Sequence, residues 1–239
     1  MNENLYDYTF KRKSNRKYDM TPLSNDQLAK IKAYADSLQP LYENIKVEYV
    51  LTNDVRNVLP ILAPHYLLIY SEKKAEYLRN VGFMFEQLDL FLSSEGLGAC
   101  WLGMARPSEK TDTSLEFVIA LAFGKTIGSP YRELSGFKRK PLSEISVGSD
   151  DRLACARLAP SAVNSQNWFF VCDNGKIHIY EKKSNAIATI MYNKMNNTNM
   201  GIVLCHLYVA TVHQGKAFTF SQDSAAKELK GYAYIGTVL

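Results

Sequence analysis

The sequence predicts an α+β fold made of two related halves, in which mixed sheets accompany a pair of long buried helices. Pro40-x-x-x-Asn44 returns 120 residues later as Pro160-x-x-x-Asn164. Three further positions return after 119 residues, with Gly82, Leu88 and Gly96 recurring as Gly201, Leu207 and Gly215. An apolar strand follows each Pro-x-x-x-Asn, and a long apolar helix precedes Gly96 and Gly215. A repeat of nearly half the chain predicts two copies packed on each other as a fused pseudo-dimer.

The first half opens with a helix whose start is marked by a capping box. Ser24 and Gln27 are spaced so that each satisfies a free backbone donor of the other, and Leu23 and Leu28 are placed as the hydrophobic staple beside them. This helix runs to about residue 38. The helix at 76–95 is apolar nearly all round, which predicts burial on most sides. Strands are expected at 45–51, 66–70 and 117–123, and the second of these is a continuous apolar run suited to a central position.

The second half repeats this order after a linker. Residues 138–150 are polar and irregular, as expected of a crossover connection. A helix is expected at 151–158, the second buried helix at 200–214, and strands at 168–172, 176–180 and 232–237. We expect the two buried helices to pack on each other across a pseudo-two-fold axis. The half-repeats then cover 1–147, with the linker, and 148–239, and together they form one compact unit.

Composition narrows the class of protein. The 239 residues are 46% hydrophobic, enough for a sizeable core, and the net charge of +4 is modest. Basic residues cluster at 11–17 and 138–140, which suits a small anionic ligand better than a nucleic-acid track. The four cysteines form no C-x-x-C pair and the four histidines lack metal-ligand spacing, so no metal site is predicted. With no signal-peptide core and no apolar run long enough to span a bilayer, we expect a soluble cytoplasmic protein.

The first segment that could carry chemistry is Arg12-Lys13-Ser14-Asn15-Arg16. In an extended conformation its alternate side chains point the same way, so two guanidinium groups flank a hydroxyl. That geometry suits a phosphate group. A solvated basic tail is the alternative interpretation.

Three other segments are less specific when taken singly. Ser94-Glu95-Gly96-Leu97-Gly98-Ala99-Cys100-Trp101 joins a helix to a strand; it lacks the third glycine of a dinucleotide fingerprint, although glycines let a backbone approach a flat ligand. Gly96 also suits a helix C-cap. Residues 137–142, with Arg139, could be a basic linker, and 159–168 could simply end a helix.

Together, the four segments resemble the FMN-dependent nitroreductase family over essentially the whole chain. The resemblance implies that the first segment holds the FMN phosphate and ribityl chain, and that the Arg139 segment returns to the phosphate. It implies that the Glu95–Gly98 backbone lies near the reactive flavin nitrogen, and that the Pro160 segment reaches the flavin as a partner subunit would. The cofactor-binding residues implied in this way are Arg12, Lys13, Ser14, Arg16, Glu95, Gly96, Leu97, Gly98, Arg139, Pro160, Ser161 and Asn164.

The chain departs from ordinary members in the order of these segments. Such members carry the Pro-Ser segment some tens of residues after Arg-x-Ser, where this chain has Pro40-Leu41-Tyr42-Glu43-Asn44. The intact version, with Asn167 in place of a proline, lies in the second half. The chain thus looks like a divergent branch with two fused half-repeats, the second acting as the partner subunit. The second half lacks an Arg-x-Ser-x-Arg segment and has Gln214-Gly215-Lys216 in place of Glu-Gly-Leu-Gly, so we expect one FMN per chain.

The resemblance implies an FMN-dependent oxidoreductase that takes hydride from NAD(P)H and reduces a nitro, quinone or similar small-molecule acceptor by a ping-pong sequence. The chemistry is then centred on the flavin, and no side chain is needed as a general acid or base. A flavin-binding or sensing protein without turnover and a degenerate scaffold remain alternatives. We expect no nucleic-acid or membrane partner and a monomeric fused unit, with further self-association left open. Tyr192 and 193–199 form either a loop over the flavin or a plain polar loop.

Overall fold

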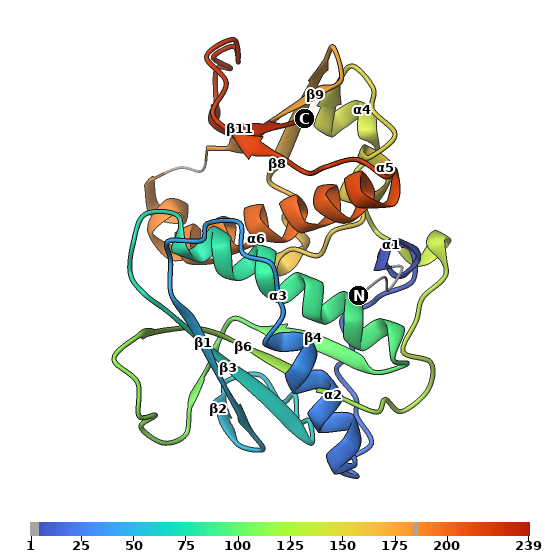
Figure 1. Cartoon of the computed structure of the whole chain (residues 1–239), viewed down its shortest axis with the longest axis vertical. Helices are drawn as coiled ribbons and strands as arrows, with labels where there is room; N and C mark the ends of the chain where they lie inside the picture. Colours follow the sequence, from blue (N-terminus) through green and yellow to red (C-terminus); the bar gives the residue numbers. More distant parts are fainter. Residues whose placement is uncertain (1–4, 184–185) are drawn as a thin grey trace.

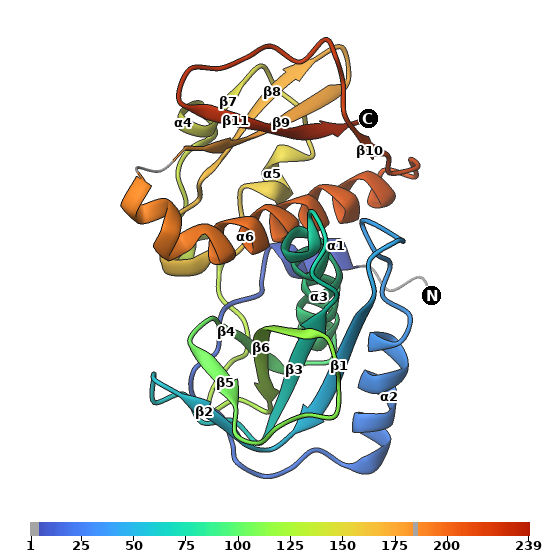
Figure 2. The ribbon, with the colours of Figure 1, turned by 90° about the vertical axis from the view of Figure 1, so that its left-hand side faces the viewer.

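Two sheets lie on opposite sides of a pair of crossing helices (Figure 1). The structure, a computed structural model, describes residues 5–183 and 186–239, and of 186–193 it describes only the backbone. Viewed from the side, the helices α3 (Tyr77–Ser94) and α6 (Ala186–His213) form the middle layer between the sheets (Figure 2). Among the described residues, no helix combines the length and apolar character needed to cross a bilayer.

The first sheet is antiparallel and has the strand order β1-β3-β6-β4. Its strands are β1 (Val47–Thr52), β3 (His65–Ser71), β6 (Glu116–Gly124) and β4 (Gly98–Leu102). Every residue of β3 is buried, which confirms the central position that its continuous apolar run predicts. Beside this sheet, β2 (Val55–Asn57) pairs with β5 (Ala105–Pro107).

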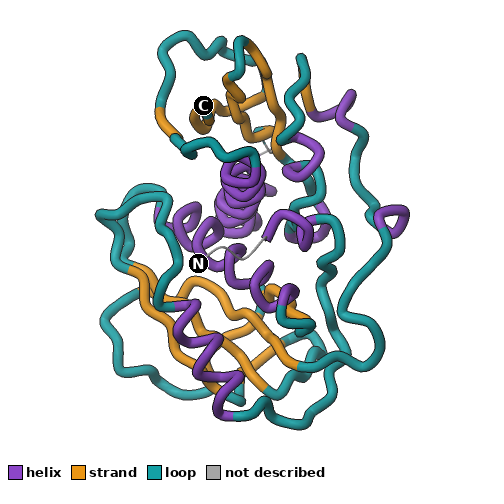
Figure 3. The backbone as a smooth tube through the Cα atoms, turned by 45° about the vertical axis from the view of Figure 1, so that its right-hand side comes forward, coloured by secondary structure: helices purple, strands orange, loops and turns teal. Residues whose placement is uncertain are grey.

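The second sheet has the order β10-β11-β9-β8-β7. Its strands are β7 (Ser146–Val147), β8 (Trp168–Asp173), β9 (Lys176–Lys182), β10 (Phe220–Ser221) and β11 (Tyr232–Val238). Four strands of this sheet correspond, in chain order, to those of the first sheet: β8 to β1, β9 to β3, β10 to β4 and β11 to β6. The spatial order is also the same, β1-β3-β6-β4 in the first sheet and β8-β9-β11-β10 in the second. In Figure 3 the two sheets flank the central helices.

The crossing of α3 and α6 is built on two glycines that the repeat places at equivalent positions. A Cβ atom on Gly82 would lie 3.0 Å from the carbonyl carbon of Thr198, and one on Gly201 would lie 2.9 Å from that of Arg79. Since Arg79 and Thr198 are themselves 119 residues apart, each helix meets its partner through the same pair of positions. Only glycine lets the backbones approach this closely. The expected packing of the two buried helices on each other is therefore confirmed.

Both central helices also end in the same way. Gly96 and Gly215 each have φ near 72°. The amide of the following residue bonds a carbonyl five residues back, from Leu97 to Leu92 (2.9 Å) and from Lys216 to Thr211 (3.1 Å). These are Schellman ends, in which glycine supplies the left-handed conformation. The prediction of Gly96 as a C-cap is confirmed.

The remaining helices are short apart from α2 (Asn25–Ala35), whose predicted capping box between Ser24 and Gln27 is present. They are α1 (Leu5–Thr9), α4 (Leu142–Ile145), α5 (Leu153–Ala156) and 3₁₀ turns at Leu134–Gly136 and Ala162–Asn164. The helix expected at 151–158 is thus only one turn long. The linker prediction at 138–150 was wrong in part, because this segment contains α4 and then β7, which adds to the second sheet by parallel pairing with β8.

The second central helix begins earlier than its apolar pattern predicts. Residues 193–199 continue α6 and do not form a loop, so the loop expectation was wrong; the side chains of Tyr192 and Asn193 lie outside the described residues. Thr198 and Asn199 are buried and bonded: the Thr198 hydroxyl donates to the Lys194 carbonyl (3.0 Å), and the Asn199 side chain accepts from Ala162 N–H (3.0 Å). These contacts outweigh the low helix propensity of Asn and Thr.

Candidate functional site

A pocket of about 280 Å³ brings together segments from both halves of the chain. Ser14 and Arg16 line it from the N-terminal segment, and Pro160 and Ser161 line it from the second half. Its walls are otherwise largely apolar, supplied by β4, by α6, by the segments near β2 and β5 and by the loop after Ser161; among them are Leu59, Trp101, Met104, Val163, Met195 and Ile202. Two segments that lie far apart in the sequence therefore meet at one concave site.

The N-terminal segment reaches the pocket because it lies along the edge of the first sheet. Asn15 N–H donates to the carbonyl of Ala99 in β4 (2.9 Å), and the Tyr18 hydroxyl donates to the Asn15 carbonyl (2.7 Å). A Cβ atom on Gly98 would lie 2.7 Å from the Cβ of Asn15. Gly98 is thus needed so that this segment can lie against β4, and it does not line the pocket.

Arg12 is buried inside this arrangement, with 1% of its surface exposed. Its guanidinium group forms an ion pair with Asp89 of α3 (3.3 Å) and lies 3.4 Å from the Ser14 hydroxyl. Burial raises the pKa of Asp89 to about 7, and the Arg12 charge opposes that rise. Since its charge is already compensated, Arg12 fixes the start of the segment and positions Ser14.

A second buried polar group lies directly behind the pocket wall. The indole of Trp101 donates to Glu86 (3.1 Å), and Glu86 is 3.0 Å from His206 Nε2 across the helix crossing. His206 Nδ1 is 3.1 Å from the Cys155 carbonyl, which only accepts, so this nitrogen carries a hydrogen. Burial raises the pKa of Glu86 to about 7 and lowers that of His206 to about 3. At mildly acidic pH both groups are neutral, and Glu86 donates its proton to His206.

The loop from Pro160 to Gln166 has an unusual backbone. Val163, Asn164 and Gln166 all have positive φ, at 48°, 56° and 46°. Such conformations are strained for residues with a Cβ and persist where surrounding contacts fix them. The Ser161 hydroxyl accepts from Gln166 N–H (3.1 Å), which closes the loop. The loop holds the Val163 side chain 83% exposed at the pocket.

Arg139 and its neighbour fasten this loop from the side of the linker. The Arg139 guanidinium donates to the carbonyls of Leu158 (3.2 Å) and Ala159 (3.1 Å) and to the Asn164 side chain (2.7 Å). Lys140 N–H donates to the Gln166 side chain (2.7 Å). Neither Arg139 nor Asn164 lines the pocket; they hold the loop that does.

The other predicted residues lie outside the pocket. Glu95 pairs with Lys30 at the end of α3 (2.7 Å), Gly96 ends that helix and Leu97 is part of the core. The Lys13 carbonyl accepts from the Asn15 side chain (3.1 Å). Trp101, Met195 and Asn199 line the pocket although they are not among the predicted cofactor-binding residues; Met195 and Asn199 belong to the segment 193–199 that was expected as a loop over the flavin or a plain polar loop. The repeat itself carried a signal for Asn199: it lies 119 residues after Asn80, and each of these side chains accepts a hydrogen bond from a backbone amide of a Pro-x-x-x-Asn loop.

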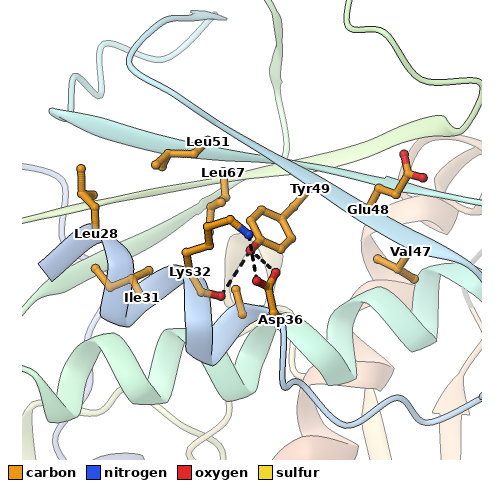
Figure 4. A pocket seen from close by; sticks show the side chains of 10 residues that line it. Leu28, Ile31, Lys32, Asp36, Val47, Glu48, Tyr49, Leu51 and Leu67 are labelled. Carbon is orange, nitrogen blue, oxygen red and sulfur yellow. Dashed lines mark hydrogen bonds and ion pairs between the residues drawn. The ribbon is translucent and has the colours of Figure 1, made fainter. Parts of the chain in front are cut away.

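A second pocket of about 420 Å³ lies between α2 and strand β1 (Figure 4). Its polar groups already bond one another: the Tyr49 hydroxyl donates to Asp36 (2.5 Å), and Lys32 pairs with Asp36 (2.8 Å). None of the residues predicted to bind a cofactor lines it. The pocket between the two halves is therefore the candidate site.

Comparison with known proteins gives the family and the fold of the chain. The chain resembles a "putative nitroreductase" from Thermotoga maritima, at 17% identity, with a TM-score of 0.68 over 100% of this chain and 93% of that one. It also matches a nitroreductase family protein from Clostridium difficile 630 (19% identity, TM-score 0.47, covering 60% of this chain and 96% of that one). An FMN-dependent nitroreductase from Clostridium difficile R20291 matches at 16% identity and a TM-score of 0.42, covering 51% of this chain and 87% of that one. No curated protein matches the chain. A family model described as "Putative TM nitroreductase" matches residues 4–211, so the chain belongs to this nitroreductase family and has its α+β fold.

Proposed function

We propose that the chain is an FMN-dependent oxidoreductase whose single flavin lies in the pocket between the two halves. The proposal rests on one observation above all, that Ser14 and Arg16 share a pocket with Pro160 and Ser161. In the sequence, the resemblance to FMN-dependent nitroreductases assigns these two segments to opposite subunits of a shared site. Their meeting within one chain supports a fused pseudo-dimer in which residues 148–239 play the part of the partner subunit.

The chemistry of the lining residues fits a flavin. The volume of about 280 Å³ lies just below the range of ligand pockets, about 300–1,000 Å³. Apolar walls from Trp101, Met195 and Ile202 suit a flat ring system, while Ser14 and Arg16 add a hydrogen-bond donor and a positive charge to the lining. Bound FMN would supply the redox chemistry, accepting hydride from NAD(P)H and reducing a nitro, quinone or similar acceptor in a ping-pong sequence.

The protein would supply position and exclusion of water. Asn199 of α6 holds the Ala162 amide, so the strained loop is fixed against the helix that forms the pocket wall. The apolar side chains of Trp101, Met195 and Ile202 line the pocket and would exclude water from the part of the flavin that they contact. Trp101 is held by its bond to Glu86, so the wall behind the ring is rigid.

The place related to the pocket by the repeat is filled by side chains, which supports one FMN per chain. Asn80 accepts from the amides of Leu41 and Tyr42 (2.8 and 2.9 Å), as Asn199 accepts from Ala162. Tyr42 stands where the other loop has Ala162, and its ring packs edge-on against Phe220, with 6.4 Å between centroids. Phe220 is the counterpart of Trp101. The Tyr42 hydroxyl accepts from Arg79 (3.3 Å).

The test is the absorption spectrum of the purified protein during a redox cycle. We expect protein saturated with FMN to hold one flavin per chain, to bleach with NADH or NADPH, and to regain its colour with a quinone or nitroaromatic compound. Arg16→Ala should weaken FMN binding at least tenfold; Lys125→Ala, another exposed cation near the segment, serves as the control. Bound flavin that neither nicotinamide reduces would favour the non-turnover alternative, and absence of flavin uptake would favour the scaffold.

A further inference from the structure

Four arginine side chains lie beside the N-terminal segment, and one of them, Arg16, lines the pocket. They are Arg12, Arg16, Arg132 and Arg139. Arg132 and Arg139 both lie over the ring of Phe137 (4.9 and 5.7 Å from its centroid), and the Arg132 amide bonds the segment itself, at the Lys11 carbonyl. Burial lowers the pKa of Arg132, and the charges of Arg12 and Arg16 lower it further. Burial also lowers the pKa of Arg139 to about 10, with Arg12 and Arg132 contributing. Like charges in such partly buried surroundings favour the binding of an anion.

The carboxylates beside the cluster do not supply that anion. Asp89 is fully buried and engages Arg12 alone, at 3.3 Å. Glu86 is bonded to Trp101 and His206. Within residues 5–183 and 186–239, neither Arg16 nor Arg132 forms an ion pair. Positive charge therefore remains uncompensated beside the pocket.

Arg132 is held in place while its donors stay unused. Its backbone amide donates to the Lys11 carbonyl (2.8 Å), next to the bridge between Tyr131 and Arg12, so it lies against the N-terminal segment. Its guanidinium group stacks on the ring of Phe137, 4.9 Å from the centroid. In the described part of the chain, its Nε is buried and has no hydrogen-bond partner. Because Nε is buried, the donors that Arg132 can offer to a phosphate are those of Nη1 and Nη2, which form no hydrogen bond in the described residues; stacking on Phe137 leaves this edge free for two-pronged binding.

Arg139 differs from Arg132 in this respect. Its Nε, Nη1 and Nη2 all donate to protein acceptors in the second half of the chain. Those bonds fasten the loop that carries Ser161, at the place where the helical turn of α5 ends. The guanidinium nitrogens of Arg139 therefore already donate to protein acceptors, whereas Nη1 and Nη2 of Arg132 remain available to a ligand.

We propose that Arg132, together with Arg16, binds the phosphate of the flavin, and that Arg139 acts as a positioning residue for the second-half loop. This inference rests on the proposed function. It assigns the phosphate to a residue between the recognised motifs, and it predicts that the site distinguishes FMN from riboflavin through Arg132.

The experiment compares binding of FMN and riboflavin to the full-length apoprotein by fluorescence quenching. We expect Arg132→Gln to raise the Kd for FMN at least tenfold and to change the Kd for riboflavin less than twofold, because only FMN carries the phosphate. Arg139→Gln should weaken both flavins by the same factor. Arg157→Gln is the matched control: it removes the same charge from a half-buried arginine near Arg139 and should alter the FMN Kd less than threefold.

The outcomes separate this inference from the proposed function. Equal weakening of FMN and riboflavin by Arg132→Gln, or an FMN-specific loss in Arg139→Gln alone, would overturn the assignment of Arg132. If Arg157→Gln weakens FMN as much as Arg132→Gln, only the net charge of the cluster matters and the assignment also fails. Wild-type protein that binds neither flavin would refute the proposed function itself, and this inference with it. Should Arg132→Gln not fold, Arg132→Lys keeps the charge without the fork and is expected to show a smaller FMN-specific loss.

Discussion

Replacing Gly201 by alanine tests the helix crossing on which both the fold and the pocket depend. The new Cβ would lie 2.7 Å from the amide nitrogen of Phe83 and 2.9 Å from the Arg79 carbonyl carbon, whereas ordinary contact begins at 3.4 Å. The obstacles are backbone atoms of α3, so no side-chain rotation relieves them. The helices must move apart by roughly half an ångström or more, and gaps of that size forfeit a quarter to a half of the dispersion energy across an interface.

The magnitude follows from two opposed terms. Overpacking of a well-packed core costs about 1–3 kcal/mol and occasionally more, and contact with rigid backbone places this site at about 3 kcal/mol or above. Alanine in a helix gains about 1 kcal/mol over glycine. We therefore expect a net loss of at least about 2 kcal/mol in the free energy of unfolding, measured from urea transitions.

A matched control and a second substitution sharpen this test. Gly136→Ala places its Cβ 3.8 Å from the nearest atom and should change stability by less than about 0.5 kcal/mol. Gly82→Ala strains the same crossing, so combining it with Gly201→Ala should cost less than the sum of the two single changes. A Gly201→Ala protein as stable as the wild type would refute the close crossing described here.

Two further predictions concern the groups behind the pocket and the loops beside it. Between about pH 4.5 and 6.5, Glu86 and His206 together hold one titratable proton: His206 holds it in the unfolded chain and Glu86 holds it in the folded chain. In Glu86→Gln only His206 titrates, and it is protonated when unfolded and neutral when folded. The free energy of unfolding of Glu86→Gln should therefore rise with pH across that window, by up to about 1.4 kcal/mol per pH unit more steeply than in the wild type. Urea transitions at three pH values measure this, and an equal pH dependence of stability in the two proteins would contradict it. Asn199→Ala should weaken FMN binding at least tenfold, whereas Asn80→Ala, which removes the equivalent bond at the filled position, should lower stability by about 1–2 kcal/mol and leave the flavin Kd unchanged.

Elements with strong local signals could be predicted from the sequence. The capping box at Ser24 and Gln27, the continuous apolar run of β3 and the glycine that ends α3 each depend on residues close together in the chain. The repeat could also be recognised although its positions lie 119 residues apart, because the same close helix crossing requires a glycine on each helix, Gly82 and Gly201.

Features that depend on distant contacts could not be predicted in this way. The early start of α6 depends on hydrogen bonds of the Thr198 and Asn199 side chains, and the hydrophobic periodicity of the sequence does not indicate these bonds. Strand β7 has two residues and exists only because β8 offers an edge beside it. Ser14 and Arg16 share a pocket with Pro160 and Ser161, but the alternation of Arg12 and Ser14 in the sequence does not indicate that Arg12 is buried in an ion pair with Asp89.

The buried polar groups mark the point at which the two halves cease to be equivalent. On α3, Glu86 and Asp89 face His206 and Arg12, yet the positions 119 residues later on α6 are Cys205 and Tyr208, which carry no charge when buried. A buried ion pair or acid costs free energy that well-packed apolar groups would not, so stability alone gives no reason to keep these groups in one copy. Glu86 contacts Trp101 and the Asp89 partner Arg12 contacts Ser14, so the polar groups lie next to the open pocket. The place related to this pocket by the repeat is filled by Tyr42 and Phe220. The asymmetry of charge in the core therefore coincides with the asymmetry of the pockets, which is expected if the polar groups serve the site and not the fold.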